Sequence, residues 1–196
     1  MVGTAIAYLL KRVNAFNGLK GSQAKRAVKT AQVVFPKSSQ DGKDLFPADK
    51  ISMLLVNISE EREQRTLDLY RNRSVPGKPN QLTRAMPSIR LTLNVLFVAC
   101  FDDYTTAWNQ LSEVIYGFQS HPVFSAEEDL DFPKSVGMIT NEMITLSMAD
   151  QRDIWSTLRS CQQPAIMYRF RVLTLVPREE QPITKVETVK VLSSHE

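Results

Sequence analysis

Apolar and polar side chains alternate most clearly between residues 89 and 97. The odd-numbered positions there are isoleucine, leucine, valine or phenylalanine, whereas Arg90, Thr92 and Asn94 are polar. A period of two indicates a strand with one buried face. The pattern therefore predicts a strand that lies against the core on one side only.

A helix is predicted directly after this strand. Asp102 and Asp103 can accept hydrogen bonds from the free N–H groups that begin a helix. Apolar residues then recur at spacings of three and four, which is typical of an amphipathic helix. Because Trp108 belongs to this apolar stripe, Trp108→Ala is expected to leave a cavity and to lower the unfolding free energy by about 3–5 kcal/mol. The stripe consists of Tyr104, Ala107, Trp108, Leu111, Val114, Ile115 and Phe118.

Two more helices follow from similar patterns. Residues 4–17 place apolar side chains on one face and end at an Asn-Gly pair. Ser147 is followed by Asp150 three positions later, as in a capping box, so a helix is expected to begin there. Its buried side is expected to carry Trp155.

Three more strands are predicted. Residues 51–58 form an almost continuous apolar run, as expected of a strand that is covered on both faces. Residues 138–146 alternate loosely. In residues 165–176, apolar side chains point one way while Arg169 and Arg171 point the other way.

The remaining segments are expected to be mostly irregular. Residues 19–49 predict an arm with at most one strand, and residues 74–87 predict an extended loop because they contain several prolines. The mixed order of strands and helices favours an α+β fold: a single domain with a mixed sheet flanked by helices. The expected domain spans residues 1–178, with extended arms or loops at 19–49 and 71–87, and a polar tail covers residues 179–196.

The composition fits one ordinary globular domain. The chain has 196 residues, of which 43% are hydrophobic and 23% charged. Cys100 and Cys161 form no CxxC pair and have apolar neighbours, so both are expected to be reduced and close to the core of a protein made in the cytosol. The first apolar run precedes its basic residues and is too short to cross a bilayer, so neither a secretion signal nor a membrane anchor is expected.

Charge is distributed unevenly. Residues 1–40 contain seven basic residues and no acidic one, whereas residues 100–153 contain ten acidic residues and two basic ones. This layout fits a polyanionic partner or contact between copies of the chain. Solvated loops in which like charges cluster remain a third interpretation.

The residues needed for catalysis are missing from recognisable patterns. His121 lies before a proline, where a structural role is expected, and His195 is next to the last residue. No serine elbow, phosphate loop, dinucleotide turn or Cys/His metal spacing is present. The acidic residues near Asp129 lack the glycine of a calcium loop. We therefore expect no enzyme activity, no cofactor and no metal.

Three stretches together resemble one family. Their order and spacing are similar to those of the tail terminator, or cap, proteins of extracellular contractile injection systems of the antifeeding-prophage and virulence-cassette type. The stretches are ISMLLVNISEE (residues 51–61), LNVLFVACFDDYTTAWNQLSEVIYGFQSHPVFS (residues 93–125) and LSMADQRDIWSTLRSCQQPAIMYRFRVLTL (residues 146–175).

The resemblance implies a structural role. Members of this family form a six-fold ring on the last layer of the inner tube and sheath, which ends polymerisation. It implies that the partners are further copies of the chain, the tube protein and the sheath protein, with no membrane and no specific nucleic acid. It also implies synthesis in the bacterial cytoplasm and incorporation into a contractile particle that can be released from the cell. Residues 165–176 and the tail are the expected edge for strand addition from the sheath.

Ten charged residues are the candidate interface of such a ring, because basic patches on one copy can meet acidic patches on the next. The alternative function is that of a monomeric adaptor that binds a polyanion or nucleic acid through its basic N-terminal arm. The candidates are Lys25, Arg26, Lys29, Glu60, Glu61, Arg62, Asp102, Asp103, Arg169 and Arg171.

Reversing the charge of Lys25, Arg26 and Lys29 together is expected to abolish incorporation into particles while leaving the fold intact. The reason is that these three residues lie in the basic N-terminal segment, which has no acidic residue to pair with nearby in sequence. Co-purification with particles, with circular dichroism as the control for folding, measures the effect. Normal incorporation of the folded variant would contradict the interface assignment.

Overall fold

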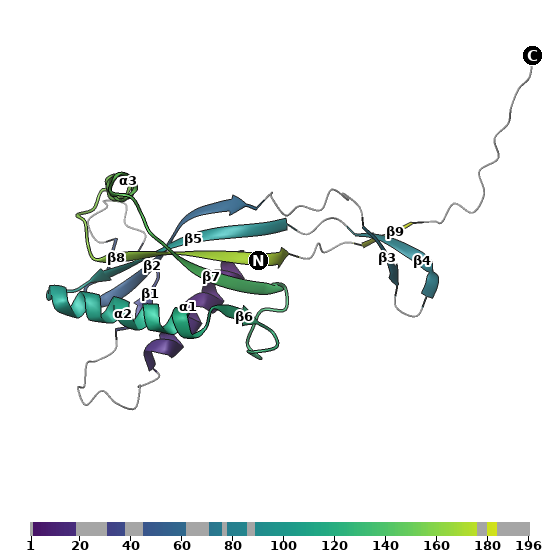
Figure 1. Ribbon diagram of the computed structural model, residues 1–196, viewed down its shortest axis with the longest axis horizontal. Helices are drawn as coiled ribbons and strands as arrows, with labels where there is room; N and C mark the ends of the chain where they lie inside the picture. The colour runs from purple at the N-terminus through teal and green to yellow at the C-terminus, as the bar shows by residue number, and fades with distance from the viewer. Residues whose placement is uncertain are drawn as a thin grey trace, which may run out of the picture.

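The computed structural model describes most of the chain. Its elements form two sheets, one of six strands and one of three, and three helices (Figure 1). The residues described are 2–18, 31–37, 45–61, 71–75, 78–85, 89–175 and 180–183.

The six-stranded sheet forms the centre of the protein. Its first pair, β1 and β2, is parallel and all its other pairs are antiparallel, so the sheet is mixed. Together with helices on both faces, this confirms the predicted α+β class. In spatial order the strands are β1 (Val33–Val34), β2 (Lys50–Glu60), β5 (Ile89–Cys100), β8 (Ala165–Leu175), β7 (Met138–Ile144) and β6 (Val123–Ser125).

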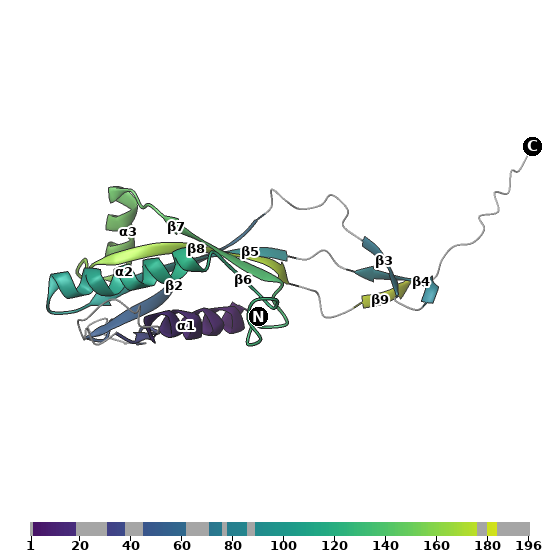
Figure 2. The same ribbon diagram turned by 60° about the horizontal axis from the view of Figure 1, so that its bottom comes forward.

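Helices cover both faces of this sheet. α1 (Val2–Gly18) and α2 (Tyr104–Ser120) lie on one face, and α3 (Met148–Leu158) lies on the other (Figures 1 and 2). Both predicted helix starts are confirmed. Asp103 caps α2 by accepting a hydrogen bond from the N–H of Thr106 at 2.7 Å, and Ser147 caps α3 in a capping box.

The middle strand β5 is buried on both faces, in contrast to the single buried face that the alternation predicts. Val95 and Phe97 point into the core beneath α1 and α2. Leu96 and Val98 point the other way and pack with Trp155 of α3. Alternation is visible only at the start of β5, where Thr92 and Asn94 are polar and are not part of the apolar cluster around Trp155.

The expected burial of β2 and the expected edge position of β8 are both wrong. Only the first half of β2 is buried, whereas its residues from Val56 onward are exposed. β8 pairs with β5 on one side and with β7 on the other, so it is an interior strand. A sequence pattern reports which face of a strand is apolar, but it does not report which strands lie beside it.

The short outer strand β1 is held by polar side chains of two helices. The side-chain amide of Asn14 in α1 donates to the carbonyl of Val33 at 2.9 Å and accepts from its N–H at 2.8 Å. The N–H of Ala31 donates to Gln110 of α2, which is itself buried. β1 is the one strand described within residues 19–49, for which at most one strand is predicted, and residues 19–30 and 38–44 of that arm lie outside the described residues.

A three-stranded sheet lies beyond one end of the larger sheet (Figures 1 and 2). It contains β3 (Arg71–Val75), β4 (Lys78–Ala85) and β9 (Glu180–Ile183). The extended loop predicted for residues 74–87 is thus wrong, since most of these residues form a hairpin, and the start of the tail pairs with it. The prolines are compatible with strands here because Pro79 falls outside the paired registers and Pro182 lies in an outer strand.

Gly117 allows α1 and α2 to approach each other closely. A Cβ atom at this position would lie 2.5 Å from the ring of Phe16, whereas one at Gly3 would meet nothing within 4 Å. Gly117→Ala is therefore expected to lower the unfolding free energy by about 1–3 kcal/mol through overpacking. Gly3→Ala is the matched control and is expected to be neutral or slightly stabilising. Chemical denaturation measures both variants, and equal stabilities would contradict the close packing.

Candidate interaction surfaces

Surfaces for binding are the features that stand out among the described residues. No group of three or more His, Cys, Asp or Glu side chains is positioned to hold a metal ion within the ranges given above. His121 ends α2, and its ring stacks on Phe16 at 4.7 Å between centroids, which is a structural position. Both cysteines are free, but Cys161 is exposed, so its expected place near the core is wrong.

No helix within the described residues is both long enough and apolar enough to span a membrane.

One half of the sheet face that carries α3 is polar and uncovered by that helix. Arg171 lies 3.2 Å from Glu142 and 4.0 Å from Glu61, and Arg169 lies 3.8 Å from Glu142. The side-chain oxygen of Asn94 is buried there without a hydrogen-bond partner. This polar sheet face brings together three of the interface candidates, Glu61, Arg169 and Arg171. Since its ion pairs are partly exposed, each contributes little to stability.

The other candidates lie elsewhere. Glu60 is exposed near the end of β2. Asp102 and Asp103 are exposed at the opposite end of β5, where the hydroxyl and backbone N–H of Thr106 hold the pKa of Asp103 below its usual range. Lys25, Arg26, Lys29 and Arg62 lie outside the described residues.

Part of the charge asymmetry is neutralised within the chain. Asp129, in the loop after β6, accepts a hydrogen bond from the hydroxyl of Tyr8 at 2.8 Å and lies 3.3 Å from the guanidinium of Arg12. Asp131 lies 2.6 Å from the ammonium of Lys11. Two of the seven basic residues within residues 1–40, Lys11 and Arg12, therefore pair with this acidic loop of the same chain.

These contacts fix the loop that contains residues 126–131, which we call the Leu130 loop. The backbone N–H groups of Glu128 and Asp129 both donate to the carbonyl of Ser125, and Phe132 is buried behind the loop. Leu130 itself is fully exposed, at 102% of the reference area. A single exposed leucine is common on protein surfaces, so Leu130 becomes informative only together with the apolar surface described next. Sequence reasoning missed it, although a leucine within the acidic run EEDLD is a visible signal.

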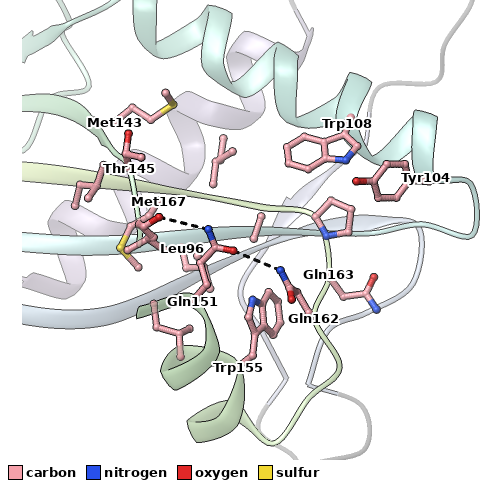
Figure 3. A pocket seen from close by; sticks show the side chains of 16 residues that line it. Leu96, Tyr104, Trp108, Met143, Thr145, Gln151, Trp155, Gln162, Gln163 and Met167 are labelled. Carbon is pink, nitrogen blue, oxygen red and sulfur yellow. Dashed lines mark hydrogen bonds between the residues drawn. The ribbon is translucent and has the colours of Figure 1, made fainter. Parts of the chain in front are cut away.

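A second apolar surface lies between α2 and α3. This aromatic groove has a volume of about 530 Å³. Figure 3 shows Tyr104 and Trp108 on the α2 side and Gln151 and Trp155 on the α3 side. None of the residues that line it is charged. Trp108 is 39% exposed, so it is not buried as the helical spacing predicts, and the loss of about 3–5 kcal/mol on its replacement by alanine stays a prediction.

The groove exists because β7 leaves the sheet early. The last pair between β7 and β8 joins Ile144 to Met167, so Ala165 and Ile166 pair with β5 alone in the described sheet. The chain then turns through residues 145–147 into α3. The amide of Gln162 donates to the side-chain oxygen of Gln151 at 3.4 Å, which orders the polar part of the groove (Figure 3).

The outer edge of β2 is a third candidate. β1 pairs with β2 only at Ile51 and Ser52, and no described strand pairs with that edge further along. Val56 and Ile58, in the same stretch, are exposed at 40% and 46%. Unpaired N–H and C=O groups beside exposed apolar side chains are the features that accept an added strand.

Comparison of the sequence with known families identifies the chain. The sequence model of the Pvc16 N-terminal domain matches residues 2–188, nearly the whole length. The chain belongs to the Pvc16 N-terminal domain family. This confirms the resemblance to terminators of contractile injection systems, although no curated protein matches the chain.

Two cryo-EM structures share the fold. One is the sheath/tube terminator of an extracellular contractile injection system, PVC, in the extended state, with a TM-score of 0.57 and 14% identity over 96% of this chain. The other is the tube-terminating cap of the anti-feeding prophage, with a TM-score of 0.58 and 13% identity over 94%. The chain spans 62% and 58% of the length of those two proteins, respectively.

The fixed Leu130 loop predicts a pH-dependent stability. The N–H of Asp131, the hydroxyl of Tyr8 and the charge of Arg12 hold the pKa of Asp129 below its usual range. A lowered carboxyl pKa stabilises the fold above the unfolded-state value near 4, and this stabilisation is lost as pH falls through the folded-state value.

Asp129→Asn is therefore expected to lower the melting temperature at pH 7, because it lowers the unfolding free energy by about 1–2 kcal/mol. The difference from the unmodified chain should shrink steadily below about pH 4. Thermal unfolding at several pH values measures this. Asp153→Asn is the control, because the ion pair of Asp153 with Arg152 is exposed and contributes little. A pH-independent difference would contradict the charge-based explanation.

Proposed function

We propose that the chain is a structural cap, which sits as a hexameric ring on the end of the tube and sheath of a contractile injection system. The observation that carries the proposal is the family match over residues 2–188. The shared fold with a sheath/tube terminator and a tube-terminating cap supports it. In this role the ring ends polymerisation, and the chain joins its particle after synthesis in the cytoplasm.

The surfaces described above suit such a role. A ring subunit needs two different contacts with its neighbours and a further contact with the layer on which it rests. The outer edge of β2 beyond Ser52 is the proposed contact with an extended segment of a sheath or tube subunit, in place of residues 165–176, which are interior. Main-chain hydrogen bonds would supply the affinity, and Val56 and Ile58 would supply apolar contacts.

Production of tube and sheath proteins with and without the chain tests the proposal. With the chain, electron microscopy should show particles of uniform length with a six-fold density at one end. Without it, tubes and sheaths should be open-ended and variable in length. The double variant Val56→Lys, Ile58→Lys is expected to fold normally, because both side chains are exposed, but to cap poorly.

The exposed Tyr116 of α2 provides the matched control, since Tyr116→Lys adds a charge away from β2. Unchanged particle length and no terminal density in the presence of the chain would reject the cap function. Salt-sensitive binding of the chain to nucleic acid, without any effect on particles, would instead favour the adaptor function.

A further inference from the structure

We propose that the Leu130 loop of one copy inserts into the aromatic groove of the next copy, so that copies associate head to tail. The inference rests on the proposed ring, since it names the contact that would join neighbouring subunits. It makes a second copy of the chain the occupant of the groove, because the loop presents an exposed apolar side chain and acidic residues, and the groove is apolar with arginines on its α3 side.

The projecting part is fixed before binding. Leu130 is fully exposed, while the adjacent Asp129 is held by the hydroxyl of Tyr8 and the guanidinium of Arg12. A loop that is already ordered loses little conformational freedom on association. The Leu130 loop therefore has the rigidity that an apolar anchor residue of an interface requires.

The receiving part is apolar, uncharged and partly open. Tyr104, Trp108 and Met143 are three of the exposed large apolar side chains of the described residues, and all three line the aromatic groove. A volume of about 530 Å³ accommodates a leucine together with its neighbouring backbone. Exposed apolar surface of this kind, bordered by polar side chains, marks an interaction site.

On the α3 side of the groove, basic residues face the acidic residues of the loop, whereas the exposed Asp102 and Asp103 flank the α2 side. Glu127 and Glu128 are exposed next to Leu130. Arg152 and Arg159 line a shallow hollow that adjoins the aromatic groove and shares Trp155 with it. Arg152 contacts only the neighbouring Asp153 at the exposed surface, so it remains able to meet an incoming carboxylate.

Arg159 provides a further indication. It ends α3 with a φ of 50°, a left-handed conformation in which glycine is usual. A large charged side chain at a position that favours glycine costs stability, which is expected where the side chain serves recognition.

The positions of the two surfaces favour a ring over a closed dimer. The groove involves the first turns of α2 at Tyr104 and Trp108, whereas the Leu130 loop follows β6, just after the last turn of this helix (Figure 1). A helix of 17 residues is about 25 Å long. Two different surfaces near opposite ends of α2 can join copies head to tail, and such contacts close into rings when the rotation permits.

Site-directed cross-linking tests the contact directly, even if it is weak in solution. In a Cys100→Ser background, Leu130→Cys should be joined by a short bismaleimide to the native Cys161 of another copy, since Cys161 lines the adjoining hollow. Head-to-tail contact predicts a ladder of trimers and larger species. Adding Cys161→Ser should abolish the ladder, and Tyr116→Cys in place of Leu130→Cys should give no ladder.

Complementation of two variants provides the second test. Leu130→Asp removes the anchor and Trp108→Ala damages the groove, so each variant alone should self-associate at least about tenfold more weakly in sedimentation experiments. Mixed together, they should form a one-to-one complex that grows no further, because only one intact contact is possible. Leu130→Met should behave like the unmodified chain.

The outcomes separate this contact from the cap function. A ladder that depends on Cys161, together with the one-to-one complex, supports the contact. The absence of the ladder, or normal self-association of Leu130→Asp, rejects it. If Leu130→Asp also caps particles normally, the cap function stands and only the head-to-tail contact is overturned.

Discussion

Burial of β5 on both faces is the constraint on which the rest of the structure depends. Its odd-numbered residues pack beneath α1 and α2, and Leu96 and Val98 pack beneath α3. Because β2 and β8 pair with β5 on either side, they are positioned by the same strand. Aromatic contacts extend this core, since Phe118 of α2 lies between 4.6 and 6.4 Å from five other aromatic rings, measured between centroids. A helix can shift little against such packing.

The same arrangement determines which surfaces stay open. α3 packs on Leu96 and Val98 of its sheet face, and the polar side chains of Arg169, Arg171 and Asn94 on the sheet are not part of that apolar cluster. The early departure of β7 from β8 opens the aromatic groove, and the shortness of β1 leaves the outer edge of β2 unpaired in the described sheet. The aromatic groove and the open edge of β2 therefore exist because β7 and β1 pair with their neighbours over only part of the length of those strands.

Local patterns in the sequence predict the elements well but their neighbours poorly. The cap at Asp103, the capping box at Ser147 and the strand with Arg169 on its polar face are all confirmed, because each depends on residues a few positions apart. The interior position of β8 and the partial exposure of Trp108 depend on residues far away in the sequence. Of the ten interface candidates, only Glu61, Arg169 and Arg171 lie together among the described residues. The exposure of Leu130 was missed because a single exposed apolar residue in a loop produces no periodic pattern in the sequence.

The exposed leucine and the open aromatic groove also fit the way a ring gains stability. A contact of one loop with one groove is small compared with a stable protein–protein interface, so two copies in solution can be weakly associated. When a ring closes, every copy is held by two interfaces. The last interface forms between subunits that are already close together, at a high effective concentration. Weak contacts between copies are thus sufficient to form the ring once the copies bind to the same tube end. On this argument the Leu130 loop and the groove need to be well ordered rather than individually strong, and the contacts of Asp129 with Tyr8 and Arg12 provide that order.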